Sequence, residues 1–187
     1  MKTKFAIIGM GQFGIAIAKT LSKKGAEVIA IDKEIHKIEE IKDFVSHAVA
    51  LDATDKQALI NQNIEDIDSV IIAIGEDFKS MILCANILTE MNIKRIVGRA
   101  MGENERLILQ KLGITEILSP EDDLGKRITN SLLNPNILFS LELPDNYLIA
   151  EIKSPKKLYG EKLGEIRLRE DFGLNLITIL RGSSQKS

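Results

Sequence analysis

The stretch FAIIGMGQFG, residues 5–14, decides the fold of this chain. Its first four residues form an apolar run of the length expected for a buried strand, and three glycines with the spacing G-x-G-x-x-G follow at once. In a strand–turn–helix unit, Gly9 permits the tight turn, Gly11 leaves room for a phosphate and Gly14 lets the helix approach the strand. The helix predicted over residues 15–24 then points its free N–H groups at an anion. The stretch therefore predicts a phosphate-binding loop.

A second predicted strand, residues 27–32, ends in an acid that fits a nucleotide site. Asp32 follows the glycines at about the 20-residue interval at which a carboxylate can hold a ribose hydroxyl. The alternative is that Asp32 only caps the next helix, a common role for aspartate. Because strand, glycine turn, helix, strand and acid occur in one unit, the nucleotide interpretation is favoured. The acid also disfavours a 2′-phosphate, so NAD(H) or an adenosine nucleotide is expected rather than NADP, although the neighbouring Lys33 softens this exclusion.

The same alternation of strand and helix continues along the chain. Further strands are predicted at residues 48–51, 69–75, 95–98 and 115–118, and further helices at residues 34–43, 56–63, 78–91 and 104–112. Six strands with five intervening helices predict an α/β fold, a Rossmann-like, doubly wound parallel sheet. Cys84 falls on the apolar face of its helix and is interpreted as a small buried hydrophobic residue.

The last third of the chain is predicted to hold a domain boundary. A helix at residues 121–133 ends the first domain, residues 1–135, and its apolar face must pack on its own sheet or on another subunit. Residues 136–187 form the second, a small α+β lobe. Its predicted elements are strands at 138–143, 147–152 and 175–180, a helical stretch around 160–169 and a disordered tail at 181–187. So short a lobe buries little core alone, so we expect it to be incomplete or to depend on a partner.

Composition narrows the functional classes. The 187 residues include 25 Lys+Arg and 27 Asp+Glu, a formal net charge of −2, which offers no basic surface for nucleic acid. The sequence has neither an apolar run of membrane-spanning length nor the layout of a signal peptide, so a cytoplasmic protein without direct membrane insertion is expected. The single cysteine excludes an internal disulfide and a cysteine-based metal cluster.

Five motifs together resemble a known family. FAIIGMGQFG, EVIAID, LDATD, VIIAIGED and SPEDDLG occur in the order and at the intervals of RCK/KTN domains, and the chain most resembles the cytosolic Ktr/TrkA-type regulatory subunits of bacterial potassium uptake systems. The resemblance covers residues 1 to about 181. It implies a lobe that binds NAD(H) or ATP/ADP without chemistry, and a helix at 121–133 that crosses to a neighbouring subunit. It further implies homodimers that assemble into a ring, typically an octamer, on a membrane potassium transporter at the inner face of the cell membrane.

The resemblance also implies the residues of a nucleotide site. The glycines would cradle the phosphates, Asp32 would hold the ribose, and Arg99 stands near the phosphates where the family usually has a lysine. Glu121 matches a glutamate that reaches a neighbour's nucleotide phosphates, often with a divalent cation, and is the candidate metal ligand. The full predicted set is Gly9, Met10, Gly11, Gln12, Phe13, Gly14, Asp32, Lys33, Asp52, Ala53, Thr54, Ala73, Ile74, Gly75, Glu76, Arg99 and Glu121.

Two departures from the family pattern change the expectations. Members that distinguish ATP from ADP commonly carry an arginine directly after the second glycine, whereas this chain has Gln12. A neutral amide cannot make the same charge-assisted contact, which favours NAD(H). The family's C-terminal lobe also continues through further strands and can bind small regulators, so residues 136–187 look like a shortened form of it.

Two classes of function compete. The first is a regulatory subunit in which nucleotide binding changes the conformation of a ring and gates a potassium transporter. The second is an NAD-dependent oxidoreductase, which would need an acid or base beside the nicotinamide. The histidines, His36 and His47, are poorly placed for that role, and no substrate domain is apparent. The sequence therefore favours a sensor that is not an enzyme.

Overall fold

The computed structural model describes residues 3–180 of the chain, and the tail predicted to be disordered, 181–187, lies outside the described residues. The chain divides into two compact units, Met1–Arg127 and Ile128–Ser187. The division falls within helix α6 (Pro120–Leu133). Each unit is described below by itself.

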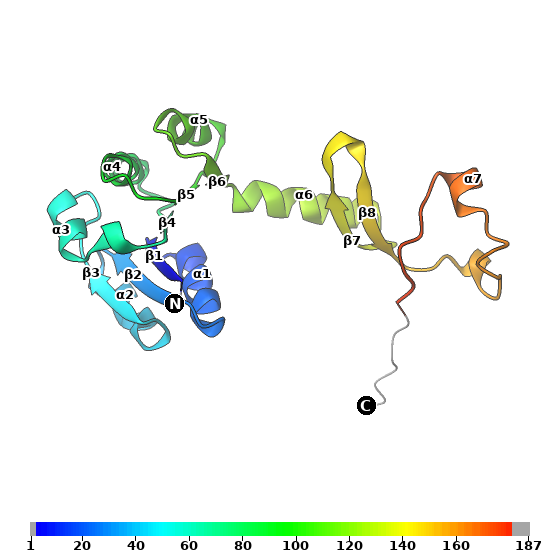
Figure 1. The fold of residues 1–187 in the computed structure, drawn as a ribbon, viewed down its shortest axis with the longest axis horizontal. Helices are drawn as coiled ribbons and strands as arrows, with labels where there is room; N and C mark the ends of the chain where they lie inside the picture. The colour runs from blue at the N-terminus through cyan, green and yellow to red at the C-terminus, as the bar shows by residue number, and fades with distance from the viewer. Residues whose placement is uncertain (1–2, 181–187) are drawn as a thin grey trace. The chain divides into compact units, whose positions relative to one another are not determined.

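The first unit is built on a six-stranded parallel sheet with the order β3-β2-β1-β4-β5-β6 (Figure 1). Its strands are β1 (Lys4–Ile8), β2 (Glu27–Asp32), β3 (His47–Ala50), β4 (Ser69–Ile72), β5 (Ile96–Arg99) and β6 (Glu116–Leu118). Ile8 pairs in register with Ile31 of β2 and with Ile72 of β4, so the carboxyl ends of these three strands lie together. The strand order reverses between β1 and β4, which confirms the doubly wound sheet predicted from the sequence.

Helices cover both faces of this sheet. They are α1 (Gln12–Lys23), α2 (Ile35–Ile41), α3 (Lys56–Asn61), α4 (Phe78–Glu90) and α5 (Glu103–Lys111), with short 3₁₀ turns at Lys42–Phe44 and Ile64–Asp66. Successive side chains of a strand point to opposite faces, so Ile7 packs in the cluster under α1 and α2 while Ile8 packs in the cluster under α3, α4 and α5. Burial on both faces explains why the central strands β1, β2 and β4 are largely apolar.

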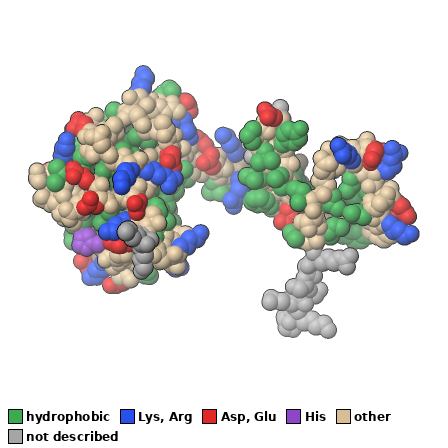
Figure 2. Space-filling model, in the orientation of Figure 1, with side chains coloured by type: hydrophobic (Ala, Val, Ile, Leu, Met, Phe, Trp, Pro, Cys, Tyr) green, Lys and Arg blue, Asp and Glu red, His purple; other side chains and the backbone are tan. Residues whose placement is uncertain are grey.

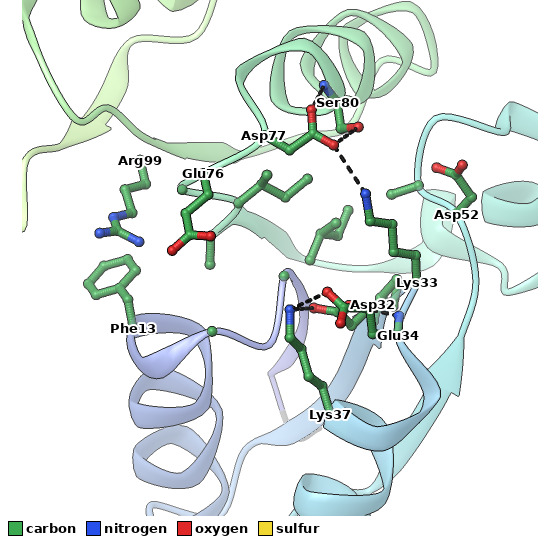
Figure 3. A pocket seen from close by; sticks show the side chains of 18 of the residues that line it. Phe13, Asp32, Lys33, Glu34, Lys37, Asp52, Glu76, Asp77, Ser80 and Arg99 are labelled. Carbon is green, nitrogen blue, oxygen red and sulfur yellow. Dashed lines mark hydrogen bonds and ion pairs between the residues drawn. The ribbon is translucent and has the colours of Figure 1, made fainter.

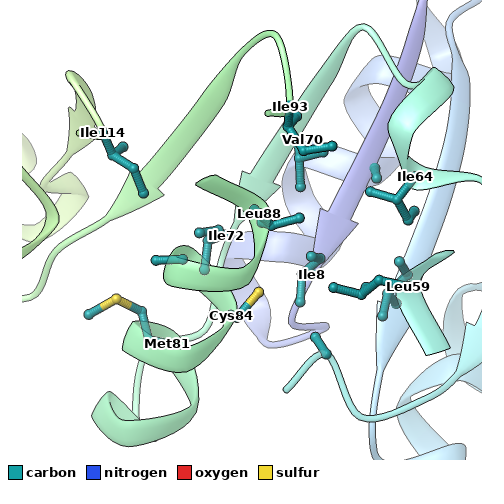
Figure 4. Packing of buried hydrophobic residues seen from close by; sticks show 14 of the residues in the cluster. Ile8, Leu59, Ile64, Val70, Ile72, Met81, Cys84, Leu88, Ile93 and Ile114 are labelled. Atoms are coloured by element: carbon teal, nitrogen blue, oxygen red, sulfur yellow. The ribbon is translucent and has the colours of Figure 1, made fainter. Parts of the chain in front are cut away.

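The larger cluster anchors α4 to the middle of the sheet (Figure 4). Met81, Cys84 and Leu88 lie on one face of α4 and pack against Val70 and Ile72 of β4. Cys84 is fully buried, and burial raises the pKa of its thiol to about 12. A thiol that stays protonated is unreactive, so Cys84 is the buried hydrophobic residue that the sequence predicted.

The second unit contains an antiparallel pair, β7 (Ile137–Glu142) and β8 (Leu148–Ile152), joined by a 3₁₀ turn at Pro144–Asn146. A further 3₁₀ turn, Lys156–Leu158, and the short helix α7 (Leu168–Phe172) follow. Many of its large apolar side chains are exposed, among them Leu138, Phe139 and Leu148. Figure 2 shows hydrophobic side chains gathered over the surface of this unit. Exposed apolar surface of this extent is typical of interaction sites, and the dependence of this lobe on a partner stays a prediction.

Three predicted elements differ in the structure. Helix α1 begins at Gln12 rather than at residue 15, so its first turn lies inside the glycine motif. The helical stretch expected around residues 160–169 is instead α7, five residues long and shifted toward the C-terminus. The predicted strand at 175–180 is wrong: that segment has no regular structure and pairs with no strand among the described residues. A strand is stable only when a neighbouring strand takes up its backbone hydrogen bonds.

Across residues 3–180, no helix has both the length and the apolar character needed to cross a membrane.

Candidate functional site

A cleft of about 870 Å³ opens at the carboxyl ends of the parallel strands, next to the neighbouring strands β1 and β4 between which the strand order reverses (Figure 3). Its volume falls within the range of small-molecule sites, and its place in the sheet is where doubly wound folds bind ligands. All predicted site residues except Met10 and Gly14 line it. Several further lining residues lie outside the predicted set, including Glu34, Lys37, Asp77, Ser80 and Met101.

The glycine loop is held close to two strands by its own backbone. Gly9 has a φ of +101°, a conformation that side chains disfavour, and a Cβ there would lie 2.9 Å from the backbone nitrogen of Ile74. A Cβ on Gly14 would lie 1.9 Å from the carbonyl oxygen of Gly9. Both glycines are therefore required by packing, as the sequence spacing indicated.

Gly11 differs from its two neighbours, because a Cβ there would meet no atom within 4 Å. It lines the cleft and forms the N-cap of α1, where no side chain caps the first N–H groups. Open space above a glycine, next to free N–H donors at a helix N-terminus, fits a phosphate group. The loop therefore suits the nucleotide that the sequence predicted.

Asp32 ties this loop to the end of β2. The residue is only 7 % exposed, and one carboxylate oxygen accepts a 2.6 Å hydrogen bond from the Met10 N–H. The other oxygen accepts a 2.9 Å bond from the Glu34 N–H at the start of α2. Asp32 thus supports both the glycine loop and the next helix, while it also lines the cleft.

Lys37 lies one turn into α2 and faces the same carboxylate. Its Nζ is 2.6 Å from Oε1 of Glu34 and 4.0 Å from Oδ2 of Asp32. The hydrogen bond with Glu34 raises the pKa of Lys37 and lowers the pKa of Glu34. On this side of the cleft, the ammonium group of Lys37 therefore offsets part of the negative charge of Glu34 and Asp32.

The loops after β2, β3 and β4 meet on that same side (Figure 3). Asp52 accepts bonds from the N–H and the hydroxyl of Thr54, at 2.9 and 2.7 Å, and these bonds lower its pKa. Lys33 after β2 reaches Asp77 after β4, with 3.1 Å between Nζ and Oδ2. Asp77 also accepts the Ser80 N–H and hydroxyl, at 3.0 and 2.7 Å.

The contacts of Asp77 predict its titration. Chiefly the two bonds from Ser80, and then Lys33, lower the pKa of Asp77 to about 2. Because the folded pKa lies below the ordinary value, the stabilisation that Asp77 provides is complete above about pH 4 and is lost as the pH falls through about 2. We expect Ser80→Ala to move the titration midpoint of Asp77 upward, as measured by carbon-13 NMR of the side-chain carboxyl.

The matched control for this titration is Asn86→Ala, which removes a polar side chain from the same helix outside the cleft, where it donates to Glu90. It should leave the midpoint of Asp77 unchanged. A midpoint near the ordinary aspartate value in the wild-type protein would contradict the geometry described here.

The opposite side of the cleft is formed by Arg99, at the end of β5. Its guanidinium carbon lies 5.2 Å from the centre of the Phe13 ring, and its Nη2 donates to Oε1 of Glu121. The pKa of Glu121 is lowered, first by a hydrogen bond from its own backbone N–H and then by Arg99. The Arg99 guanidinium therefore stands beside the first turn of α1, where the family resemblance implies the phosphates.

Several polar lining groups of the cleft are engaged with one another. Among the described residues the lining includes neither histidine nor cysteine, and the hydroxyls of Thr54 and Ser80 are engaged with carboxylates. His36 does not line the cleft. Its side chain is exposed, and its Nε2 lies 3.6 Å from Oε2 of Glu34. Within the part of the chain that the structure covers, no group of three or more His, Cys, Asp or Glu side chains could hold a metal ion.

Comparison with known proteins identifies the family. The TrkA-N domain matches residues 5–120, more than half of the chain. The chain belongs to the TrkA-N domain family. The matched segment contains the glycine loop, the acid at the end of β2 and all six strands of the sheet. The resemblance carried by the five motifs is thereby confirmed.

The TrkA-N protein is also similar to named proteins along most of its length. It is 38% identical over 182 residues to the Ktr system potassium uptake protein C of Bacillus subtilis (strain 168), with 97% of this chain and 82% of the relative covered. The Ktr system potassium uptake protein A of the same organism is 32% identical over 176 residues, with 94% and 79% covered. A solved structure, GsuK bound to ADP, is 28% identical with a TM-score of 0.57, and the match covers 71% of this chain and 34% of that one.

Proposed function

We propose that this TrkA-N protein is a nucleotide-sensing regulatory subunit of a membrane potassium transporter. The observation that carries the proposal is the cleft itself, in which the glycine loop, Asp32 and Arg99 lie around a space of nucleotide size. The role in potassium transport is supported by relatives that are named Ktr system potassium uptake proteins, which the chain matches over most of their length.

The ligand is NAD(H) or an adenine nucleotide, ATP or ADP. The buried carboxylate of Asp32 suits a free ribose hydroxyl and opposes a 2′-phosphate. Gln12, which lines the cleft, brings no charge to the phosphates, so a dinucleotide with its less charged pyrophosphate is favoured over ATP. The ADP-bound GsuK structure supports an adenine nucleotide as the alternative. For ATP or ADP, which carry more charge than NAD(H), the proposal includes a divalent cation bound beside Glu121.

Regulation follows if each ligand binds two conformations with different affinity, because only such a difference can shift their populations. The proposed functional form is a homodimer that assembles into a ring, an octamer, on the cytoplasmic side of the transporter, with no nucleic acid partner. Residues 1–135 form the nucleotide lobe and residues 136–187 the second lobe. The exposed apolar side chains of β7 and β8 support contact between subunits.

Calorimetric titration tests the proposal against the alternative, an NAD-dependent oxidoreductase. We expect NADH, NAD, ATP or ADP to bind the purified protein and to be recovered unchanged, as followed by NADH absorbance and chromatography. NADPH serves as the matched control and should bind at least about tenfold more weakly than NADH because of Asp32. Steady oxidation of NADH in the presence of small metabolites would establish the oxidoreductase instead, and failure of all four ligands to bind would refute the sensor.

A further inference from the structure

Two lysines stand beside the acid at the end of β2. Lys33 follows Asp32 directly, and Lys37 lies in the first turn of α2, with its Nζ 4.0 Å from Oδ2 of Asp32. Both lysines line the cleft. In doubly wound folds an acid at this place holds the ribose 2′-hydroxyl, whereas a cation nearby accommodates a 2′-phosphate. This side of the cleft therefore carries groups that suit both kinds of ribose.

The ammonium group of Lys33 is paired across the cleft. Its Nζ lies 3.1 Å from Oδ2 of Asp77, in the loop after β4 (Figure 3). The hydrogen bond with Asp77 is also the first cause of the raised pKa of Lys33. Because β2 and β4 flank β1 in the sheet, this pair joins the loops that follow its two neighbouring strands. Lys33 is thus engaged by a residue far from it in the sequence.

Asp77 is a fixed and ionised partner. Its carboxylate caps α4 and accepts the Ser80 N–H and hydroxyl, at 3.0 and 2.7 Å, and its pKa is lowered to about 2. A carboxylate held in this way cannot follow Lys33 when the ammonium group turns toward a ligand. A 2′-phosphate that takes Lys33 therefore leaves the charge of Asp77 unpaired beside it, and the two anions repel each other.

Lys37 is engaged as well. Its Nζ lies 2.6 Å from Oε1 of Glu34, and this hydrogen bond raises the pKa of Lys37. Asp52, whose pKa is lowered, adds a further carboxylate whose charge acts on Lys33 in the same direction as that of Asp77. A 2′-phosphate on this side of the cleft meets ammonium groups that are already paired and carboxylates that repel it.

We propose that Asp77 is a specificity-determining residue, which holds Lys33 and so denies it to a 2′-phosphate. Discrimination against 2′-phosphorylated nucleotides then depends on the loop after β4 as well as on Asp32. This inference rests on the proposed function, because it requires the ribose of a nucleotide at the end of β2. Lys33, which on sequence grounds softens the exclusion of NADP, becomes part of that exclusion through its pairing with Asp77.

The test uses two pairs of ligands that differ only in a 2′-phosphate, NADH with NADPH and AMP with 2′,5′-ADP. Each is titrated calorimetrically into wild-type protein and Asp77→Asn. Asparagine keeps the N-cap of α4, because it caps helices as well as aspartate does, and removes the charge that holds Lys33. We expect the preference for the ligand without the 2′-phosphate to fall about three- to fivefold, the range of a partly exposed ion pair.

Asp55→Asn is the matched control. It makes the same substitution at the N-cap of α3, outside the cleft, and should leave the preference unchanged. A double-mutant cycle isolates the pairing itself. In a Lys33→Gln background, Asp77→Asn should lose most of its effect on the preference, since no ammonium group is left to release.

The outcomes separate the inference from the proposed function. If Asp77→Asn keeps the wild-type preference, or if wild-type protein binds both members of each pair equally, the inference is overturned alone. An equal effect of Asp77→Asn with and without Lys33 also overturns it, because the charge of Asp77 would then act without the lysine. Wild-type protein that binds no nucleotide overturns the proposed function and the inference with it.

Discussion

Gly14→Ala is expected to lower the free energy of unfolding by about 3 kcal/mol, at the upper end of what overpacking a protein interior costs. The new Cβ would lie 1.9 Å from the carbonyl oxygen of Gly9 and 3.1 Å from its carbonyl carbon. These are backbone atoms of a residue that is itself fixed, because the Gly9 N–H donates a 2.8 Å bond to the Ile31 carbonyl oxygen. Either the loop or α1 must therefore move. Urea denaturation followed by circular dichroism measures the loss.

Gly11→Ala is the matched control for that variant. Its Cβ would meet no atom within 4 Å and its φ of −76° suits alanine, so we expect a loss of stability of about 1 kcal/mol or less, from the weaker N-cap. The same methyl would stand in the space assigned to the phosphate, and nucleotide affinity should fall by about tenfold or more. Equal stability of the two variants would contradict the close contact at Gly14. Unchanged nucleotide binding by Gly11→Ala would contradict the placement of a ligand phosphate on this loop.

The central strands of the first unit, β1, β2 and β4, could be predicted from the sequence because they are apolar runs that are largely buried. The bounds of β2, residues 27–32, are those predicted, and the other strands differ only at their ends. The start of α1 was missed because Gln12 and Phe13 carry no apolar periodicity and Gly14 is typical of a turn. The packing of Gly14 against Gly9 allows the helix to start there, and that contact has no local signal in the sequence.

The segment at residues 175–180 shows the limit of strand prediction. Its β-branched and apolar residues fit a strand in composition, yet Ile177 and Leu180 are exposed in the structure and no described strand pairs with the segment. Composition indicates what a segment can form, whereas a partner strand decides whether it forms.

The candidate site likewise contains features that could be predicted from the sequence and features that could not. Residues at the carboxyl ends of strands, such as Asp32 and Arg99, could be predicted because parallel strands end at one edge of the sheet. The pairing of Lys33 with Asp77 could not, since it joins the loops after β2 and β4 through the reach of two side chains. Sequence spacing therefore places the backbone of the site, and contacts across the cleft determine its charge balance.

Asp32→Ala is expected to lower the free energy of unfolding by about 3 kcal/mol, because it leaves two backbone N–H groups without their charged acceptor in a largely buried place. Those groups belong to Met10 and Glu34, at 2.6 and 2.9 Å from the carboxylate. The variant should also lose nucleotide affinity, since the glycine loop loses its tie to β2 and the ribose its acceptor.

Asp55→Ala removes the same side chain from the N-cap of α3, where it accepts the Gln57 and Ala58 N–H groups outside the cleft. It should cost about 1 kcal/mol, as N-caps usually do, and leave nucleotide binding intact. The comparison separates the two roles of Asp32. If the folded Asp32→Ala variant binds nucleotide as well as Asp55→Ala does, the carboxylate serves the loop alone and the ribose lies elsewhere. If the two variants are equally stable, the bond to the Met10 N–H contributes no more than an exposed cap.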